Sequence, residues 1–388
     1  GGRHGMKVRI IGGGPAGLYF ATLMKRRDPA HDVTVFERGP RDATWGFGVV
    51  FSDRALEFLR ADDPATYALL MPRMEIWPNL TIAHNDTKIP IAGNGFAAAG
   101  RLDLLNALQG QAESLGVRLE FSREIAALDD PDLVDADLIV AANGAFSWVR
   151  SGNEAAFGTH TDMRPNRFIW YGTSKVFDSL TLTFRETEHG VFCAHHYRYS
   201  PRMSTFLVEV TDATWHKAGF AAMGEDETIS HCQEVFAADL EGEPILSNKS
   251  NWRQFPAIWN ERWNAGKVVL MGDALRTAHF SIGSGTRLAM EDAIALWKSL
   301  GETADLSAAL ERYRERRLPP MKKIWDAANA SIRWYERMDE LIALSPVDFA
   351  YSYMTRTGRV DHEEVMRRDP RLAAAWAQNH PEIFGDSY

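Results

Sequence analysis

Cysteine is scarce in this chain of 388 residues, and long apolar runs are missing from it. The two cysteines, Cys193 and Cys232, lie far apart and form no C-x-x-C pair. Neither a dithiol redox centre nor a thiolate metal site is therefore expected. No apolar stretch approaches the roughly 20 residues needed to span a bilayer, and no secretory leader is visible. The sequence predicts a protein of the reducing cytoplasm, with no metal and no membrane segment.

Positive charge is also in deficit. The chain has 43 lysines and arginines against 52 acidic residues, a net charge of −9. Nucleic-acid binders are usually basic, so no nucleic-acid partner is expected. A hydrophobic content of 45% and a charged content of 24% are ordinary for a globular protein. The length allows one large core or two modest ones.

Two kinds of strand pattern predict two domains. Short apolar runs at 7–11, 32–36, 137–141 and 268–271 are typical of buried parallel strands. From about residue 167, segments rich in aromatic and β-branched residues alternate with short polar links, which predicts an antiparallel sheet. The predicted fold is α/β (α+β): a Rossmann-like nucleotide-binding domain interrupted by an antiparallel sheet domain, with a helical C-terminal region. The expected bounds are 6–75, 99–165 and 258–388 for the first domain, and 76–98 and 166–257 for the second.

The first strand runs into a dinucleotide fingerprint. Residues 12–17 fit G-x-G-x-x-G between a strand and the helix expected at 15–27. Gly12 permits the tight turn, Gly14 lets the backbone approach a pyrophosphate, and Gly17 allows close helix packing. Pro15 and Ala16 open the helix, whose free N–H groups favour phosphate. Glu37 ends the next strand, beside Arg38, where a carboxylate should bind the adenosine ribose.

A distant segment turns this fingerprint into a flavin prediction. Gly272 and Asp273 end the strand expected at 268–271, and an acid at that place can bind the ribityl chain of FAD. A glycine-rich turn then opens a helix, which can direct N–H groups at the flavin ring where negative charge collects on reduction. The residues of that turn are Gly283, Ser284, Gly285 and Thr286.

These motifs resemble those of the single-component (group A) FAD aromatic hydroxylases, with the p-hydroxybenzoate hydroxylase-like fold, from Met6 onward. Further marks are Arg101 at the start of a helix and the segment 137–150, which contains Asn143 and Gly144. The resemblance implies that Arg101 contacts FAD and that Asn143–Gly144 serve FAD and the nicotinamide donor. It also implies flavin contacts in the loop formed by Trp45, Phe47, Gly48 and Val49.

Within that family two subgroups are similar. Segments 47–53, 164–168, 252–256, 260–263 and 278–296 resemble salicylyl-CoA 5-hydroxylase and 2-aminobenzoyl-CoA monooxygenase. Segments 169–174, 204–206 and 279–283 resemble the violacein-pathway tryptophan hydroxylase. Three positions depart from the wider family: Asn143 replaces an aspartate, Arg276 a histidine and Phe280 a proline.

The resemblance implies an NAD(P)H- and O2-dependent monooxygenase that acts through a C4a-hydroperoxyflavin. The expected substrate is an aryl-CoA such as salicylyl-CoA (5-hydroxylation) or 2-aminobenzoyl-CoA. A free aromatic such as tryptophan or an indole is the alternative, and a flavin reductase or oxidase on the same fold is a further one. NADH and NADPH are both open, as are a monomer and a homodimer.

Three residues are the catalytic candidates. His279 lies in the loop expected over the flavin, and a histidine with an ordinary pKa near 6.5 suits proton transfer at neutral pH; the alternative is a histidine that only holds the loop. His195 and Tyr197 alternate with Tyr199 along one strand, so one face carries all three. That face could roof a substrate pocket or be covered by protein. A basic run could meet CoA phosphates or be a solvated helix face; it comprises Arg312, Arg314, Arg316, Arg317, Lys322 and Lys323.

Overall fold

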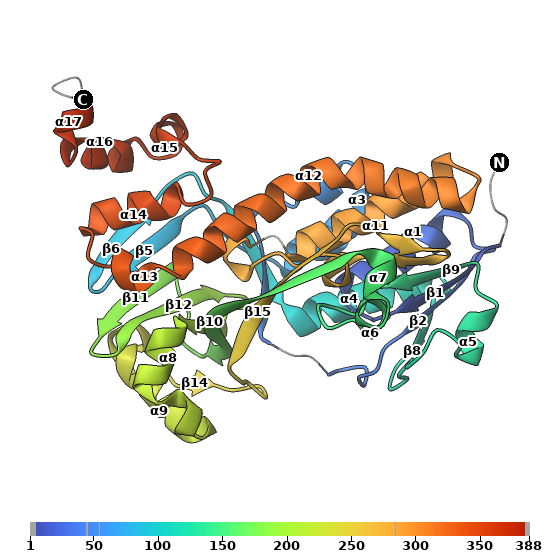
Figure 1. Ribbon diagram of the computed structural model, residues 1–388, viewed down its shortest axis with the longest axis horizontal. Coiled ribbons are helices and arrows are strands. Elements are labelled where there is room, and N and C mark those ends of the chain that lie inside the picture. Colours follow the sequence, from blue (N-terminus) through green and yellow to red (C-terminus); the bar gives the residue numbers. More distant parts are fainter. Residues whose placement is uncertain (1–4, 44–45, 54, 284, 385–388) are drawn as a thin grey trace.

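The computed structural model describes residues 5–43, 46–53, 55–283 and 285–384. Two large sheets lie at opposite ends of an elongated molecule, and the 30-residue helix α12 (Leu306–Tyr335) runs along both (Figure 1). Among the described residues, no helix is long and apolar enough to cross a membrane.

The first sheet has the largely parallel, Rossmann-like arrangement that the sequence predicts. Its order is β16-β17-β9-β1-β2-β8, and every pair except β16–β17 is parallel. Helices α1, α4 and α11 accompany it, and α1 packs on both α4 and α11. The strands are β1 (Lys7–Ile11), β2 (Asp32–Phe36), β8 (Arg118–Glu120), β9 (Leu138–Ala141), β16 (Asn264–Ala265) and β17 (Val268–Leu270), and the helices are α1 (Pro15–Arg27), α4 (Arg101–Ser114) and α11 (Gly285–Glu302).

The second sheet has eight strands and is largely antiparallel, as predicted. Its order is β14-β10-β13-β12-β11-β5-β6, with β15 paired to β10; only the β11–β5 pair is parallel. Aromatic and β-branched side chains fill it because they pack well on a pleated surface. The strands are β5 (Leu80–His84), β6 (Thr87–Ile91), β10 (Thr159–Thr173), β11 (Leu180–Thr187), β12 (Gly190–Arg198), β13 (Ser204–Val210), β14 (Ile245–Leu246) and β15 (Arg253–Asn260).

A third, three-stranded sheet joins the other two. Strand β7 (Phe96–Gly100) lies between β3 (Gly48–Phe51) and β4 (Glu75–Trp77), and it leads directly into α4 at Arg101. This sheet is not predictable from the sequence pattern, because its strands are short and far apart in the chain. It places the loop before β3 next to the start of α4, where the backbone N–H of Arg101 donates to the carbonyl of Phe47 at 3.0 Å.

The C-terminal helices pack against the second sheet. Residues from Trp334 to Ala373 share one core with Leu80, Ile82 and Phe184 of that sheet. The predicted domain bounds assign residues 258–388 to the FAD-binding domain and stay a prediction. The shared core shows that the C-terminal helices also pack on the second sheet. The helices are α13 (Met338–Leu341), α14 (Pro346–Met354), α15 (His362–Arg368), α16 (Pro370–Gln378) and α17 (Pro381–Phe384).

The segment 225–240 forms two helices in succession. Phe236 leaves the helical region (φ −103°, ψ 20°), so α9 (Glu225–Val235) ends before α10 (Ala237–Leu240) begins. The remaining short helices are α2 (Glu57–Arg60), α3 (Pro64–Leu70), α5 (Pro131–Val134), α6 (Trp148–Ser151), α7 (Glu154–Phe157) and α8 (Asp212–Ala218), with single 3-10 turns η1 (Met71–Arg73), η2 (Phe220–Ala222), η3 (Gly272–Ala274) and η4 (Phe280–Ile282).

Candidate flavin and substrate site

The turn between β1 and α1 has the geometry that its glycines predict. Gly12 has φ +112°, and a Cβ there would lie 2.3 Å from the carbonyl oxygen of Ala142. A Cβ on Gly17 would lie 2.4 Å from the carbonyl oxygen of Gly12. Around Gly14, in contrast, no atom lies within 4 Å of such a Cβ. The turn is therefore closed on its protein side and open where a pyrophosphate would approach.

Glu37 is held by the same turn. Its two carboxylate oxygens accept hydrogen bonds from the backbone N–H groups of Gly13 (3.1 Å) and Gly39 (2.6 Å). The side chain is half-buried, whereas that of the neighbouring Arg38 is exposed. Each carboxylate oxygen has a second lone pair, so Glu37 can still accept from a ribose hydroxyl.

Arg101 and Asp273 lie close enough to interact electrostatically, and the turn at Gly272 packs against Ala16 of α1. Neither side chain makes a hydrogen bond within the described residues. The nearby carboxylates of Asp273 and Glu37 nevertheless favour the charged form of Arg101. Asp273 is reached by solvent, yet protein surrounds it closely enough for burial to raise its pKa, against the opposing effect of Arg276 and Arg101. Two opposite charges without hydrogen-bond partners in the described residues suit a ligand rich in hydroxyl and amide groups.

The neighbouring segment from β9 fits the same ligand. The side-chain oxygen of Asn143 is enclosed and has no hydrogen-bond partner among the described residues. A Cβ on Gly144 (φ +86°) or on Gly285 would meet no atom within 4 Å. An unsatisfied buried acceptor costs about 1–3 kcal/mol, so a donor from a bound group at this place is stabilising. The residues present thus fit FAD.

Replacing Arg101 with methionine should separate binding from folding. We expect the free energy of unfolding without FAD to be unchanged or higher, because a poorly paired, desolvated cation is removed. FAD affinity should fall about 10-fold or more, since hydrogen bonds to charged groups contribute about 1.5–3 kcal/mol. Fluorescence titration with FAD and urea unfolding check the two parts, and unchanged FAD affinity would contradict the assignment.

The departure at Arg276 has a structural explanation. Its guanidinium is buried and donates to the carbonyl of Gly272 (2.7 Å) and to both carboxylate oxygens of Asp292 (2.8 Å). Asp292 also accepts from the backbone N–H of Gly272 (3.0 Å) and from Arg317 (2.8 Å). This buried cluster (Arg276, Asp292 and Arg317) ties the Gly272–Asp273 turn to α11 and α12. Arg150 adds a second tie, since it donates to the carbonyl of Ala274 at 3.0 Å.

The basic run therefore does not form one surface. Arg317 belongs to the buried cluster, and Arg316 pairs with Glu302. Arg314 donates to the carbonyl of Glu261 and Lys322 pairs with Asp326. Most of these cations thus already have partners within the protein. The interpretation of the run as a CoA-phosphate patch therefore loses its support.

His279 lies at the centre of an aromatic cluster. Its ring centroid is 3.9 Å from that of Phe280 and 4.9 Å from that of Phe255, the latter edge-to-face. Phe280, the residue that replaces the family's proline, also contacts His195 (5.2 Å). Phe168 and Trp170 complete this substrate-side cluster against Phe280, at 4.9 and 6.5 Å. An aromatic ring could be bound here by edge-to-face and stacked contacts.

The environment of His279 corrects one expectation. Burial lowers its pKa well below the ordinary value, and the charges of His195 and Arg356 lower it further. The residue is therefore neutral at pH 7 and does not have the pKa that makes a histidine an efficient acid or base there.

His195 and Tyr197 lie on one face but have different surroundings. His195 approaches Phe280 and Tyr335 and has Glu209 3.1 Å from its Nε2. Tyr197 is buried beside Trp77 and donates to the carbonyl of Gly48 at 3.1 Å. The structure thus brings His195 and His279 together around Phe280. Tyr197, in contrast, packs against the loop that carries Phe47, Gly48 and Val49. A catalytic role for any of the three stays a prediction.

That loop lies between the turn at Gly283 and the second sheet. The ring of Phe47 leaves no room for a side chain at Gly172, where a Cβ would lie 2.5 Å from it. The backbone N–H of Gly48 donates to Thr205, and that of Ser52 to the carbonyl of Gly283. Gly285 and Thr286 begin α11 beside it. Trp45 and Ser284, two further predicted contacts, lie outside the described residues.

Sequence reasoning missed several residues of this region. Phe255 belongs to the similar segment 252–256, so that segment was a usable signal for it. Tyr335, Ser331 and Arg356 come from the C-terminal helices and carry no local motif. The segment 164–168 is also explained: Arg164 pairs with Glu336 at 2.6 Å, and Asn166 donates to Glu209 at 2.9 Å, so it fixes the partner of His195.

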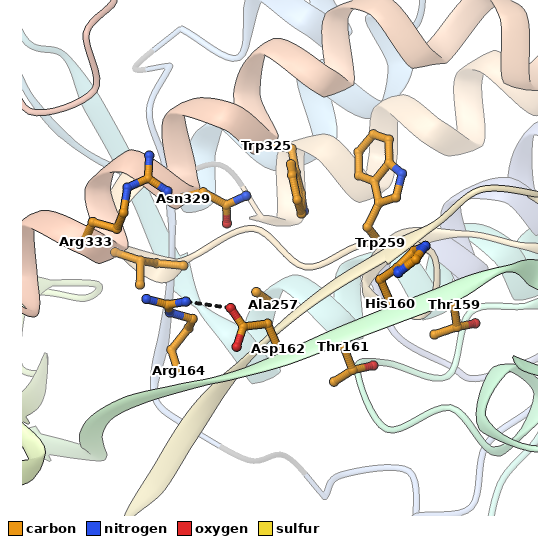
Figure 2. Close-up of a pocket in the computed structure, with 11 residues that line it drawn as sticks. Thr159, His160, Thr161, Asp162, Arg164, Ala257, Trp259, Trp325, Asn329 and Arg333 are labelled. Carbon is orange, nitrogen blue, oxygen red and sulfur yellow. Dashed lines mark hydrogen bonds and ion pairs between the residues drawn. The ribbon is translucent and has the colours of Figure 1, made fainter.

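A separate pocket of about 410 Å³ lies between β10, β15 and α12 (Figure 2). Trp259 and Trp325 form one wall, with ring centroids 4.8 Å apart, and Arg164 pairs with Asp162 on the β10 side. None of the predicted flavin or catalytic residues lines it. The chemistry is therefore not placed there.

The fingerprint turn and the open glycines fit an FAD-binding protein, and its relatives place it in the class of FAD-dependent aromatic hydroxylases. The chain belongs to the family described as "FAD binding domain", whose model matches residues 5–328. It is a monooxygenase that uses FAD with NAD(P)H.

Several relatives support this assignment, and one solved structure shares the fold. The chain is 38% identical to a salicyloyl-CoA 5-hydroxylase of Streptomyces, over 97% of this chain and 75% of that protein. It is 37% identical to a 3-hydroxy-4-methyl-anthranilyl-[aryl-carrier protein] 5-monooxygenase of Streptosporangium sibiricum (87% and 91% covered). It is 34% identical to a protodeoxyviolaceinate monooxygenase of Chromobacterium violaceum (90% and 94%). The fold matches 2-methyl-3-hydroxypyridine-5-carboxylic acid oxygenase, with a TM-score of 0.69, 18% identity, and 94% and 98% covered.

Proposed function

We propose that this enzyme hydroxylates the ring of an aromatic acid carried as a thioester, with an aryl-CoA such as salicylyl-CoA as the first candidate and 2-aminobenzoyl-CoA as the second. The observation that carries the proposal is the 38% identity to the salicyloyl-CoA enzyme along nearly the whole chain. The carrier-protein relative supports it, because both names place the new hydroxyl at ring position 5. Position 5 lies para to position 2, where a hydroxyl or amino group donates electrons.

The flavin contacts are part of the same proposal. Gly12, Gly14, Pro15, Ala16 and Gly17 would hold the pyrophosphate, and Glu37 the ribose, with Arg38 beside it. Arg101, Gly272 and Asp273 would meet the ribityl chain. The groups that would lie at the flavin ring and donor are Phe47, Gly48, Val49, Asn143, Gly144, Gly283, Ser284, Gly285 and Thr286. When bound, FAD supplies the activation of O2 with electrons from NADH or NADPH.

The substrate-side cluster orients the ring and excludes water. Phe168, Trp170, Phe255 and Phe280 offer aromatic faces and edges, and water exclusion protects reactive species from hydrolysis. Nδ1 of His279 is hydrogen-bonded to Oγ of Ser281 at 2.6 Å, whereas Nε2 of His279 makes no hydrogen bond within the described residues. Nε2 is also not among the enclosed polar atoms without a partner, so it borders accessible space. His279 would therefore hydrogen-bond the substituent at ring position 2.

The substrate proposal is tested by a panel of candidates. NAD(P)H oxidation is measured with salicylyl-CoA, 2-aminobenzoyl-CoA, free salicylate and tryptophan, and the masses of the products are determined by mass spectrometry. We expect a gain of one oxygen with an aryl-CoA and none with free salicylate. Hydroxylation of only free compounds would overturn the thioester proposal, and oxidation of NAD(P)H with peroxide but no oxygenated product would favour an oxidase.

A free aromatic substrate such as tryptophan or an indole is the second candidate. The relative named for protodeoxyviolaceinate, at 34% identity, is the observation that favours it. In the panel above it predicts an oxygenated product from tryptophan or an indole and none from either thioester.

Replacing His279 with alanine should weaken turnover of a 2-hydroxy substrate. We expect kcat/KM to fall roughly 10- to 100-fold, because a lost hydrogen bond that strands its partner costs about 1–3 kcal/mol. FAD affinity should not change, since no predicted flavin contact is removed. Steady-state kinetics and flavin titration check this, and an unchanged kcat and KM would show that His279 only holds its loop.

Two broader expectations also stay proposals. A cytoplasmic location is supported by two cysteines that are both free and buried. A monomer and a homodimer remain open, and light scattering of the FAD-loaded protein distinguishes them.

A further inference from the structure

A chain of hydrogen bonds connects His279 to the C-terminal helices. Nδ1 of His279 lies 2.6 Å from Oγ of Ser281, and that oxygen lies 2.7 Å from Oγ of Ser331 near the C-terminal end of α12. Nε of Arg356, which follows α14, lies 2.8 Å from Oγ of Ser331. Arg356 also donates to the carbonyls of Ser281 (3.2 Å) and Tyr353 (3.0 Å). Four residues from three separate parts of the chain thus form one line.

Both ends of this line fix its direction. A guanidinium can only donate, so Ser331 accepts from Arg356. At the other end, the backbone N–H of Ser281 donates to Nδ1 of His279 at 3.3 Å, because His279 caps the 3-10 turn η4. A ring nitrogen that accepts carries no proton in the neutral imidazole. Ser281 therefore donates to Nδ1, and Ser331 donates to Ser281.

The remaining proton of the neutral ring must then sit on Nε2. The charged and titratable groups that face His279 are His195 from β12, Tyr335 from α12 and Arg356. The positive charge of Arg356 and the burial of the ring both oppose a second proton, so the ring stays neutral. Nε2, which borders accessible space, consequently presents an N–H group.

We propose that Arg356, Ser331 and Ser281 are positioning residues that fix His279 as a hydrogen-bond donor at Nε2, directed at an oxygen acceptor on the aromatic ring. This inference rests on the proposed function for its substrate. A donor at a phenolic oxygen stabilises the phenolate, and the phenolate pushes electrons to the para carbon that is to be hydroxylated. An aromatic amine is a much poorer acceptor, because its lone pair is delocalised into the ring. The geometry thus favours a 2-hydroxy ring over a 2-amino ring.

The tautomer is measured directly by nitrogen NMR of the FAD-loaded protein with labelled histidine. His279→Asn assigns the signal. We expect a neutral ring with the proton on Nε2 at pH 7 in the wild type. Ser281→Ala and Arg356→Met should each produce a mixture with the Nδ1–H form or a protonated ring, and Arg356→Lys should restore the wild-type spectrum. Arg359→Gln, at an exposed position three residues further on, is the matched control.

Kinetics give a second readout. In Ser281→Ala and Arg356→Met we expect kcat/KM for a 2-hydroxy substrate to fall about 2- to 10-fold, with a smaller change for the analogue without that hydroxyl. A wild-type ring with its proton on Nδ1, a doubly protonated ring at pH 7, or a spectrum that none of the variants changes would overturn the proposal. Because the spectrum needs no substrate, it separates this inference from the substrate proposal, which fails only in the product panel.

Discussion

Gly14→Ala is expected to leave the fold intact and to remove most of the FAD affinity. The backbone at Gly14 is extended (φ −79°, ψ −177°), a conformation that alanine adopts without strain, and a Cβ there meets no protein atom within 4 Å. The free energy of unfolding without FAD should therefore be unchanged or about 0.4–1 kcal/mol higher, because alanine restricts the unfolded chain.

The same methyl group would stand where a pyrophosphate must approach. Overpacking costs about 1–3 kcal/mol, which corresponds to a roughly 5- to 150-fold higher dissociation constant for FAD. Flavin titration measures it, and the rise in Tm on adding FAD should shrink accordingly. Gly110→Ala, in α4 at a position with equally open space, is the matched control and should not affect FAD binding. Normal FAD affinity in Gly14→Ala would contradict the placement of the pyrophosphate.

Asp292→Ala is expected to destabilise the fold more than Arg101→Met, His279→Ala or Gly14→Ala. Asp292 is fully buried and is the shared acceptor for Arg276 and Arg317. Its loss leaves buried Arg276 without its carboxylate partner and leaves Arg317 only the longer contact with Glu291 (3.6 Å), and breaking a buried pair in this way costs about 3–5 kcal/mol. The turn at Gly272 also loses its acceptor, so the affinity for FAD should fall as well.

Urea unfolding at constant m-value measures the effect of Asp292→Ala. The control is Asp326→Ala, whose partner Lys322 forms an exposed ion pair with it on α12; about 0–1 kcal/mol is expected there. Equal losses in the two variants would mean that the buried cluster does not hold the Gly272–Asp273 turn.

Much of the FAD domain could be predicted from the sequence. The strands at 7–11 and 32–36 and the helix at 15–27 are confirmed at their predicted residues. Local physics explains this success, because a tight turn, a close approach and a helix start each require particular residues at adjacent positions. The three-stranded sheet was missed for the opposite reason, since its strands are too short to show a period.

The surroundings of the candidate catalytic residue could not be predicted. The sequence singled out His279 from its loop, with an ordinary pKa, whereas burial and Arg356 make it neutral. The partners that decide its state stand at positions 281, 331 and 356, and the last two have no motif. Likewise, the sequence shows Arg276 only as a departure from the family's histidine, whereas the structure places it in a buried ion pair with Asp292.

By itself, the sequence determined that the chain binds a dinucleotide, that the nucleotide is FAD, and roughly where the flavin domain and the antiparallel sheet lie. Those conclusions rest on backbone demands that short, contiguous motifs express. Only the tertiary structure decided which side chains surround His279 and which of its two ring nitrogens carries the proton. A protonation state depends on burial and on charges within a few ångströms, and helices that are far away in the chain supply both.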